Sequence, residues 1–262
     1  MSFNVKKIHY PHKTEYIFYS KPIDTEISSF EQIPKKGYWE KQNINGDSVY
    51  INSNTGEIRE EQDITHCQEV SRKRSLNVIT QLAHANDWDW FYTLTFNPDI
   101  IDSFNYDECY KAVYTFFNNL RKRKAPDIKY LVVPELHKSG RYHFHALVAN
   151  SGSLEYEPSN KPYVYNIKGF KYGFTTATKV KDTKRVSSYI TKYITKEIGC
   201  VSDGRHRYLA SRNLNRPAEE TLYLSITELE ELKLKTLEES EYFKNVEIPV
   251  SGNKITYGHV GK

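Results

Sequence analysis

The chain has 262 residues, a formal net charge of +4 and three cysteines. It is long enough to bury a core, its few cysteines exclude a disulfide scaffold, and the lack of any apolar run of about 18 residues excludes a membrane-spanning helix. We therefore expect a soluble, cytoplasmic protein with no membrane partner, built from one central domain and smaller regions at each end.

The first region, residues 1–70, has short apolar groups around Tyr16–Tyr19 and Val49–Ile51 among many polar residues. These groups predict a small β-rich region, whose role the sequence does not reveal. The central domain is expected at residues 71–220. It opens at residue 72 with a predicted helix, because apolar residues recur at helical intervals at Leu76, Ile79, Leu82 and Ala83.

A strand and a second helix follow in the central domain. WFYTLTF (90–96) has the aromatic and β-branched composition of a buried strand. Asn105 and Glu108 form a capping pair for a helix with one apolar face. The basic run RKRK (121–124) closes this helix, at the end where cations interact favourably with the helix dipole.

The middle of the domain predicts a β-hairpin. KYLVVPEL (129–136) and RYHFHALVA (141–149) have the composition of two strands, and Gly140 stands at the turn between them. Residues 163–166 and 172–180 are expected to form further strands of the same sheet.

Asp182 or Thr183 can cap a last helix of the domain, which runs to about Ile198. The order of these elements predicts an α+β fold, in which an antiparallel sheet carries helices packed on one face. The third region, residues 221–262, contains a predicted strand, TLYLSI (221–226). An acidic helix is expected to follow it over residues 227–243.

Two histidines in the second hairpin strand point to one side of the sheet. In a strand, residues i and i+2 share a face, so His143 and His145 project together. Glu135 stands on the partner strand at the right depth to meet them. Two imidazoles and one carboxylate make a three-ligand site that leaves positions open for water and substrate oxygens. We expect one divalent ion here, Mg²⁺ or Mn²⁺, while two polar residues that simply share a sheet face remain the alternative.

The predicted helix at residues 186–198 carries an unusual stripe of phenols and ammonium groups beside an apolar stripe. Four residues fall within an arc of roughly 100°, namely Tyr189, Lys192, Tyr193 and Lys196. A phenol is a weak nucleophile at neutral pH, but nearby ammonium groups and a metal favour the phenolate, which can attack a phosphodiester. Ordinary packing of the two rings stays open, because the chain has 21 tyrosines.

Charge is unevenly spread along the chain. Residues 120–141 carry seven Lys and Arg against two acids and residues 168–196 carry eight against one, whereas residues 225–247 are acidic. A basic middle points toward a polyanion such as nucleic acid, although solvated surface explains the same charges. The candidate DNA-binding residues are Arg121, Lys122, Arg123, Lys124, Arg141, Lys179, Lys181, Lys184 and Arg185.

Taken in order, these segments resemble the replication initiators of the HUH endonuclease family, which is named for histidine, hydrophobic residue, histidine. YTLTF (92–96) resembles its first motif, HFH (143–145) its second, and YITKYITK (189–196) its third. The third has the doubled-tyrosine form seen in initiators of some single-stranded DNA phages and related plasmids. The likeness extends over roughly residues 70–220, and the N-terminal 65 residues and the acidic C-terminal helix have no clear counterpart.

The resemblance implies an RRM-like HUH core and a metal-dependent, site-specific DNA endonuclease and strand transferase. The family's metal ligands carry over onto Glu135, His143 and His145, its nucleophiles onto Tyr189 and Tyr193, and its assisting lysines onto Lys192 and Lys196. The implied reaction nicks and rejoins single-stranded or hairpin origin DNA through a 5′-phosphotyrosine bond, which starts rolling-circle replication. A host polymerase extends the free 3′-hydroxyl. Because the sequence has no G-x-x-x-x-G-K-[ST] loop, unwinding falls to a separate host helicase.

Two other functions stay open at this point. A transposase uses the same chemistry to move an element instead of replicating one. A non-catalytic module that binds single-stranded nucleic acid needs exposed aromatic residues on the sheet and has no use for Glu135. The sequence does not reveal the origin, the kind of replicon, the order in which the tyrosines act or the oligomeric state.

Overall fold

The computed structural model describes residues 2–24, 39–44, 47–52, 56–183, 185–187, 189–190, 205–248 and 252–261. The chain divides into two compact units. We call Lys36–Asn215 the central unit, and Met1–Lys35 with Arg216–Lys262 the terminal unit. No helix in the described part of the chain is both long enough and apolar enough to cross a membrane.

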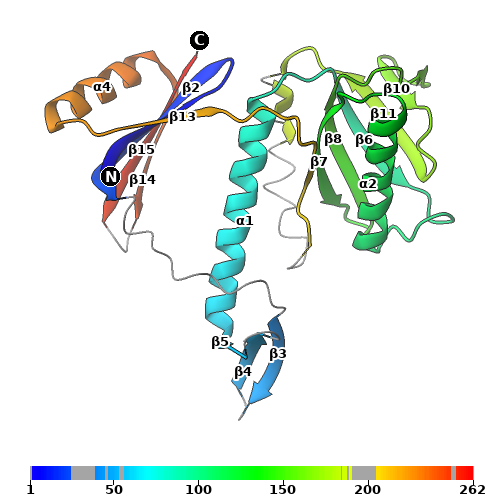
Figure 1. Ribbon diagram of the computed structural model, residues 1–262, viewed down its shortest axis with the longest axis horizontal. Coiled ribbons are helices and arrows are strands. Elements are labelled where there is room, and N and C mark those ends of the chain that lie inside the picture. Colours follow the sequence, from blue (N-terminus) through cyan, green and yellow to red (C-terminus); the bar gives the residue numbers. More distant parts are fainter. Residues whose placement is uncertain are drawn as a thin grey trace. The chain divides into compact units, whose positions relative to one another are not determined.

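The central unit is built around a seven-stranded sheet (Figure 1) with the strand order β12-β7-β8-β6-β11-β10-β9 and antiparallel pairing throughout. Its strands are β6 (Trp90–Phe96), β7 (Lys129–Leu136), β8 (Tyr142–Ala149), β9 (Tyr156–Pro158), β10 (Val164–Ile167), β11 (Gly173–Lys179) and β12 (Leu209–Ala210). The five strands expected from the sequence are confirmed to within about a residue at each end. β9 and β12 were not expected, because runs of two or three residues are too short to show a period.

Two helices cover the two faces of this sheet. α2 (Tyr106–Arg123) packs on the face that carries Phe144 and Ala146, whereas α1 (Glu61–His84) packs on the face that carries Leu147. The predicted α+β class is confirmed, but helices lie on both faces of the sheet instead of on one. The physical reason lies in β8, whose last residues are apolar on both sides, so that both faces have to be shielded from water.

Local signals set the start of α2 and the turn of the hairpin, as expected. The Asn105 side chain caps α2, because its carbonyl oxygen accepts hydrogen bonds from the backbone N–H groups of Asp107 and Glu108. Its amide in turn donates to the Glu108 carboxylate at 3.2 Å. Gly140 adopts a φ of +82° between β7 and β8, in a region that side chains with a Cβ rarely enter. The hairpin that carries the histidines is therefore closed by its own sequence.

A small three-stranded sheet precedes α1 within the central unit. It consists of β3 (Trp39–Ile44), β4 (Asp47–Asn52) and β5 (Ile58–Glu60) in that order. The β-rich character expected around Val49–Ile51 is confirmed. α1 itself begins eleven residues before the expected start at residue 72, because its first turns are polar and show no apolar stripe.

The terminal unit joins the two ends of the chain in one sheet of order β13-β1-β2-β15-β14. Its elements are β1 (Ser2–His9), β2 (Lys13–Asp24), β13 (Ala218–Leu222), α4 (Ile226–Glu239), β14 (Ser240–Ile248) and β15 (Asn253–Gly261). The acidic helix expected through residue 243 is present but ends at Glu239, where β14 starts. The sequence analysis treated the two ends as separate regions, because pairing between strands more than 200 residues apart leaves no local pattern.

Candidate active site

The side chains of interest lie in two adjacent rows across the centre of the sheet. Glu135 of β7 is directly opposite His143 of β8, and Thr95 of β6 is opposite His143 on its other side. The next row on the same face contains His145, with Thr93 opposite it on β6. The pairing register of three strands therefore brings the carboxylate and both imidazoles to one place, as the sequence predicted.

Both imidazoles are oriented by threonines of β6. The hydroxyl of Thr95 lies 3.2 Å from Nδ1 of His143, and the hydroxyl of Thr93 lies 3.2 Å from Nδ1 of His145. When Nδ1 of a ring is occupied in this way, the ring presents Nε2 to a ligand. The sequence analysis did not identify either threonine as a functional residue. The signal was present in YTLTF (92–96), because its alternation places both hydroxyls on the face opposite the buried residues.

Glu135 and His145 contact each other directly, with 2.6 Å between Oε2 and Nε2. This hydrogen bond is the main reason why the pKa of Glu135 is lowered from its usual value. The pKa of His143 is lowered too, first by burial and then by the nearby His137. An ionised carboxylate and a neutral imidazole are the forms in which these groups bind metals.

The donor set fits a hard or borderline divalent cation, because it consists of one carboxylate and two imidazoles whose second nitrogens are held by hydroxyls. Within the described residues, no three His, Cys, Asp or Glu side chains are gathered so that they could hold a metal ion as they lie. Binding an ion at this place thus requires the Glu135 carboxylate to exchange its contact with His145 for a bond to the metal.

Tyr189 stands on the same sheet face as the histidines. The Phe91 ring of β6 stacks on the His145 ring at 5.6 Å between centroids and meets the Tyr189 ring edge-on at 5.5 Å. Tyr189 is 45% exposed, whereas Ile190 beside it is fully buried in the core on the α1 side. The buried Ser187 hydroxyl donates to the carbonyl of Ala83 at 2.7 Å and ties this helical segment to the end of α1.

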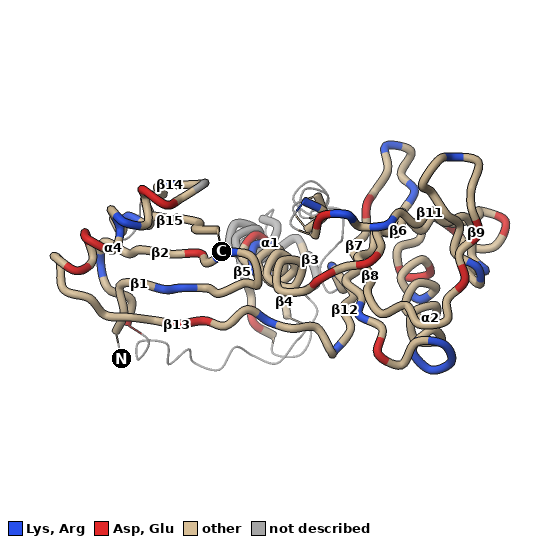
Figure 2. The backbone as a smooth tube through the Cα atoms, turned by 90° about the horizontal axis from the view of Figure 1, so that it is seen from above, with Lys and Arg blue, Asp and Glu red and all other residues tan. Residues whose placement is uncertain are grey.

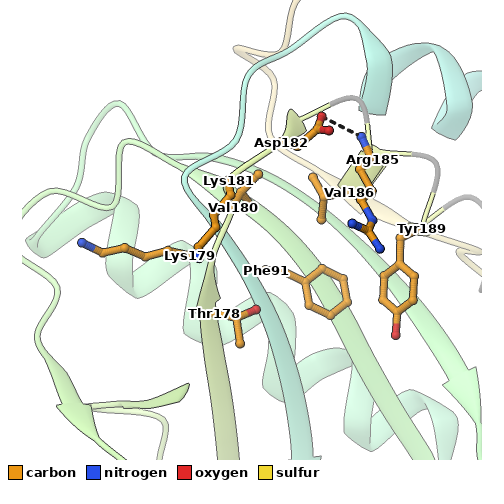
Figure 3. A pocket seen from close by; sticks show the side chains of 9 residues that line it. All are labelled: Phe91, Thr178, Lys179, Val180, Lys181, Asp182, Arg185, Val186 and Tyr189. Atoms are coloured by element: carbon orange, nitrogen blue, oxygen red, sulfur yellow. Dashed lines mark hydrogen bonds between the residues drawn. The ribbon is translucent and has the colours of Figure 1, made fainter. Parts of the chain in front are cut away.

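A cavity of about 440 Å³ opens beside Tyr189 (Figure 3). Its walls are Phe91, Thr178, Lys179, Val180, Lys181, Asp182, Arg185, Val186 and Tyr189. Asp182 caps the segment as expected, because its carboxylate accepts a hydrogen bond from the backbone N–H of Arg185 at 3.0 Å. Figure 3 shows the Tyr189 ring next to Phe91, with its hydroxyl at the end of the cavity away from Asp182. The cavity thus combines three cations, an aromatic floor and the phenol.

The predicted DNA-binding residues fall into separate groups. Lys179, Lys181 and Arg185 line the cavity beside Tyr189. The cations at the end of α2, which form a continuous basic segment in Figure 2, belong to the opposite face of the sheet. There Arg123, Lys124, Lys168 and Lys171 border a second cavity, of about 400 Å³. Arg141 lies at the hairpin turn, with its guanidinium 5.5 Å from the centre of the Phe104 ring.

Four of the predicted site residues, Lys184, Lys192, Tyr193 and Lys196, lie outside the described residues. Their proposed roles therefore rest on the sequence. Phe91, which connects His145 to Tyr189, was seen in the sequence only as part of a buried strand. No periodic pattern could have identified it, because its role arises from contacts between β8, β6 and the helical segment.

Residues 89–198 match the model of a family of replication-associated proteins, the ORF2 type. The matched segment is less than half of the chain and includes Glu135, both histidines and both tyrosines of the candidate site. No curated protein and no solved structure matches the chain. The family match supports a replication initiator of the Rep type, with a role in starting DNA replication.

Proposed function

We propose that this chain is an endonuclease that initiates rolling-circle replication of a phage or plasmid by nicking and rejoining single-stranded origin DNA. The observation that supports it most is the contact chain on one sheet face from Glu135 through His145 and Phe91 to Tyr189. A candidate metal site and a candidate nucleophile are thereby brought together inside the segment that matches a replication-associated family.

Glu135, His143 and His145 hold one Mg²⁺ or Mn²⁺ ion in this proposal. A bound divalent ion polarises a non-bridging phosphate oxygen and makes the phosphorus more electrophilic. Thr93 and Thr95 keep the two imidazoles in the orientation that presents Nε2. Phe91 separates the histidine from the phenol by the thickness of one aromatic ring, which leaves room for a phosphodiester between them.

The nucleophile is the Tyr189 phenol. Its oxygen forms a bond to phosphorus and loses its proton to solvent, while the bond from phosphorus to the 3′-oxygen breaks and that oxygen takes up a proton. One phosphoester bond replaces another, so the reverse reaction rejoins the strand without ATP. The free 3′-hydroxyl primes a host polymerase, a separate host helicase unwinds the duplex, and Lys192 and Lys196 assist at the phosphate and the phenolate.

The test is a covalent trap. The purified full chain is incubated with Mn²⁺ and labelled single-stranded DNA that carries the replication origin, and the products are separated on a denaturing gel. The proposal expects a band of protein linked to DNA that disappears after protease treatment and does not form when EDTA is present. If the labelled DNA is bound but no linked band forms under any divalent ion, the chain is a binding module and not a nuclease.

Salt dependence distinguishes the two groups of cations. Changing Lys179, Lys181 and Arg185 together to Gln removes up to three phosphate contacts beside Tyr189. For a single strand of about 12 nucleotides, the slope of log K against log salt should then become shallower by about 2, at 0.7 per contact. Fluorescence anisotropy between low and moderate salt measures both slopes.

The matched control changes Arg121, Lys122 and Arg123 to Gln. These cations belong to the opposite sheet face, so the slope for the short strand should stay within error of the wild-type value, while a longer hairpin substrate can reach them. Equal slopes for the wild type and the Lys179, Lys181, Arg185 variant would show that the cavity cations are solvated surface.

A further inference from the structure

One large apolar side chain of the central sheet is exposed among the described residues. Phe174 of β11 is 72% exposed, whereas its neighbours on the strand alternate, with Thr175 and Ala177 buried toward α2. A single exposed apolar residue is ordinary on a protein surface. The position of Phe174 in the sheet gives it significance.

Phe174 continues the row of the candidate metal ligands. It is paired with Thr95, which is paired with His143, which is paired with Glu135. Phe174 thus lies two strand spacings from His143, about 10 Å at the usual spacing of neighbouring strands. No sequence motif drew attention to it, because only the strand order places β11 beside β6.

The same face of β11 leads from Phe174 to the cavity beside Tyr189. Phe174, Thr176 and Thr178 alternate on this face, and Thr178 forms part of the cavity wall with Lys179 and Lys181. Four residues of a strand span about 13 Å. An aromatic ring, two small hydroxyl side chains and a basic cavity therefore follow one another along the edge of the candidate site.

The backbone next to Phe174 holds β11 close to β6. Gly173 has a φ of +154°, and a Cβ on it would lie 2.2 Å from the carbonyl oxygen of Thr95. A glycine is needed for this close approach. The position of the Phe174 ring is consequently fixed relative to Thr95, the partner of His143.

We propose that Phe174 is a stacking platform for one base of the bound single strand and so sets the position of the strand relative to the candidate metal site. The proposal rests on the proposed function, because it takes single-stranded DNA as the ligand. Stacking on an aromatic ring tolerates any base, since every base has a π face, and it complements the phosphate contacts of the cations in the cavity. Phe174 acts through the position of the strand and not on the reacting atoms.

The test compares Phe174→Ala, Phe174→Leu and Phe174→Trp in the full chain, with a labelled single strand of about 20 nucleotides and mixed sequence. Anisotropy should show roughly 5- to 150-fold weaker binding for the Ala variant, from the usual stacking contribution of one base. The Trp variant should bind at least as tightly as the wild type. The Leu variant should resemble Ala, because it keeps apolar volume but has no aromatic face.

Two controls separate stacking from other effects. Tyr114→Ala removes a 49% exposed ring from α2, on the other side of the sheet, and should leave binding unchanged. A strand of abasic sugars with the same number of phosphates should bind the wild type and Phe174→Ala equally. Thermal unfolding followed by circular dichroism verifies that each variant is folded.

The failures are distinguishable. If the wild type binds the strand and Phe174→Ala binds it equally well, the stacking proposal is wrong while the proposed function stands. If Phe174→Leu binds as well as the wild type, the ring provides apolar cover and does not stack. If the wild type binds no single strand at all, both proposals are overturned.

Discussion

Tyr189→Phe is expected to lower the initial rate of covalent adduct formation below about one-thousandth of the wild-type rate, because it removes the attacking oxygen. The change keeps the ring that meets Phe91, and Ser187 and Ile190 still anchor the segment, so the fold should be unaffected. The measurement is a time course of the protein–DNA band on a denaturing gel. Tyr163→Phe is the matched control, since it removes the hydroxyl of an 81% exposed tyrosine whose ring lies below Lys181.

The second tyrosine makes the prediction sharper. Tyr193 follows one helical turn after Tyr189 in the sequence, and we propose that the two phenols alternate when replication ends with a second cleavage. Tyr193→Phe should still form the first adduct but should be slow to close the replicated circle. The double variant should form no adduct at all. An adduct in the double variant would place the nucleophile elsewhere and leave this helix a packing element.

His145→Ala is expected to weaken Mn²⁺ binding by at least about 100-fold, because even the loss of an outer hydrogen-bond partner of a metal ligand costs up to that much. Calorimetric titration of the protein with Mn²⁺ measures the affinity without reference to activity. Glu135→Gln should have a similar effect, since the amide keeps the size of the side chain but loses its charge. Both variants should lose nicking together with the metal.

The matched control for the metal site is His137→Ala. His137 lies at the hairpin turn with its ring centroid 5.4 Å from that of His143, yet its Nδ1 is engaged by the Ser139 hydroxyl at 3.0 Å. We expect it to leave the Mn²⁺ affinity within about threefold, because it supplies no ligand in the proposed set. If His137→Ala abolishes binding while His145→Ala does not, the ligand assignment has to be redrawn around the turn.

Much of the site could be predicted because its signals are local. The separation of His143 and His145 by one residue fixes a common face as soon as β8 is a strand, and Gly140 brings Glu135 back opposite them. Asn105 likewise fixes the start of α2 through contacts within three residues. The chemical roles of these residues stay predictions that the experiments above address.

Other features could not be predicted, because they depend on which strands become neighbours. Thr93, Thr95 and Phe174 acquire their place only when β6 lies between β8 and β11. The sequence analysis grouped the basic run at the end of α2 with Lys179 and Lys181, but α2 packs on the other face of the sheet and separates the two groups.

The sequence by itself thus determined the elements of the central unit, the pairing of two histidines with a carboxylate, and the stripe that includes Tyr189. Periodicity, caps and turns are properties of a few consecutive residues, so they can be recognised without the fold. Only the tertiary structure decided that helices cover both faces, that Phe91 links His145 to Tyr189, and that β1 and β13 pair across 200 residues. Those outcomes depend on burying apolar surface from distant segments at once, and no local pattern records which segments will meet.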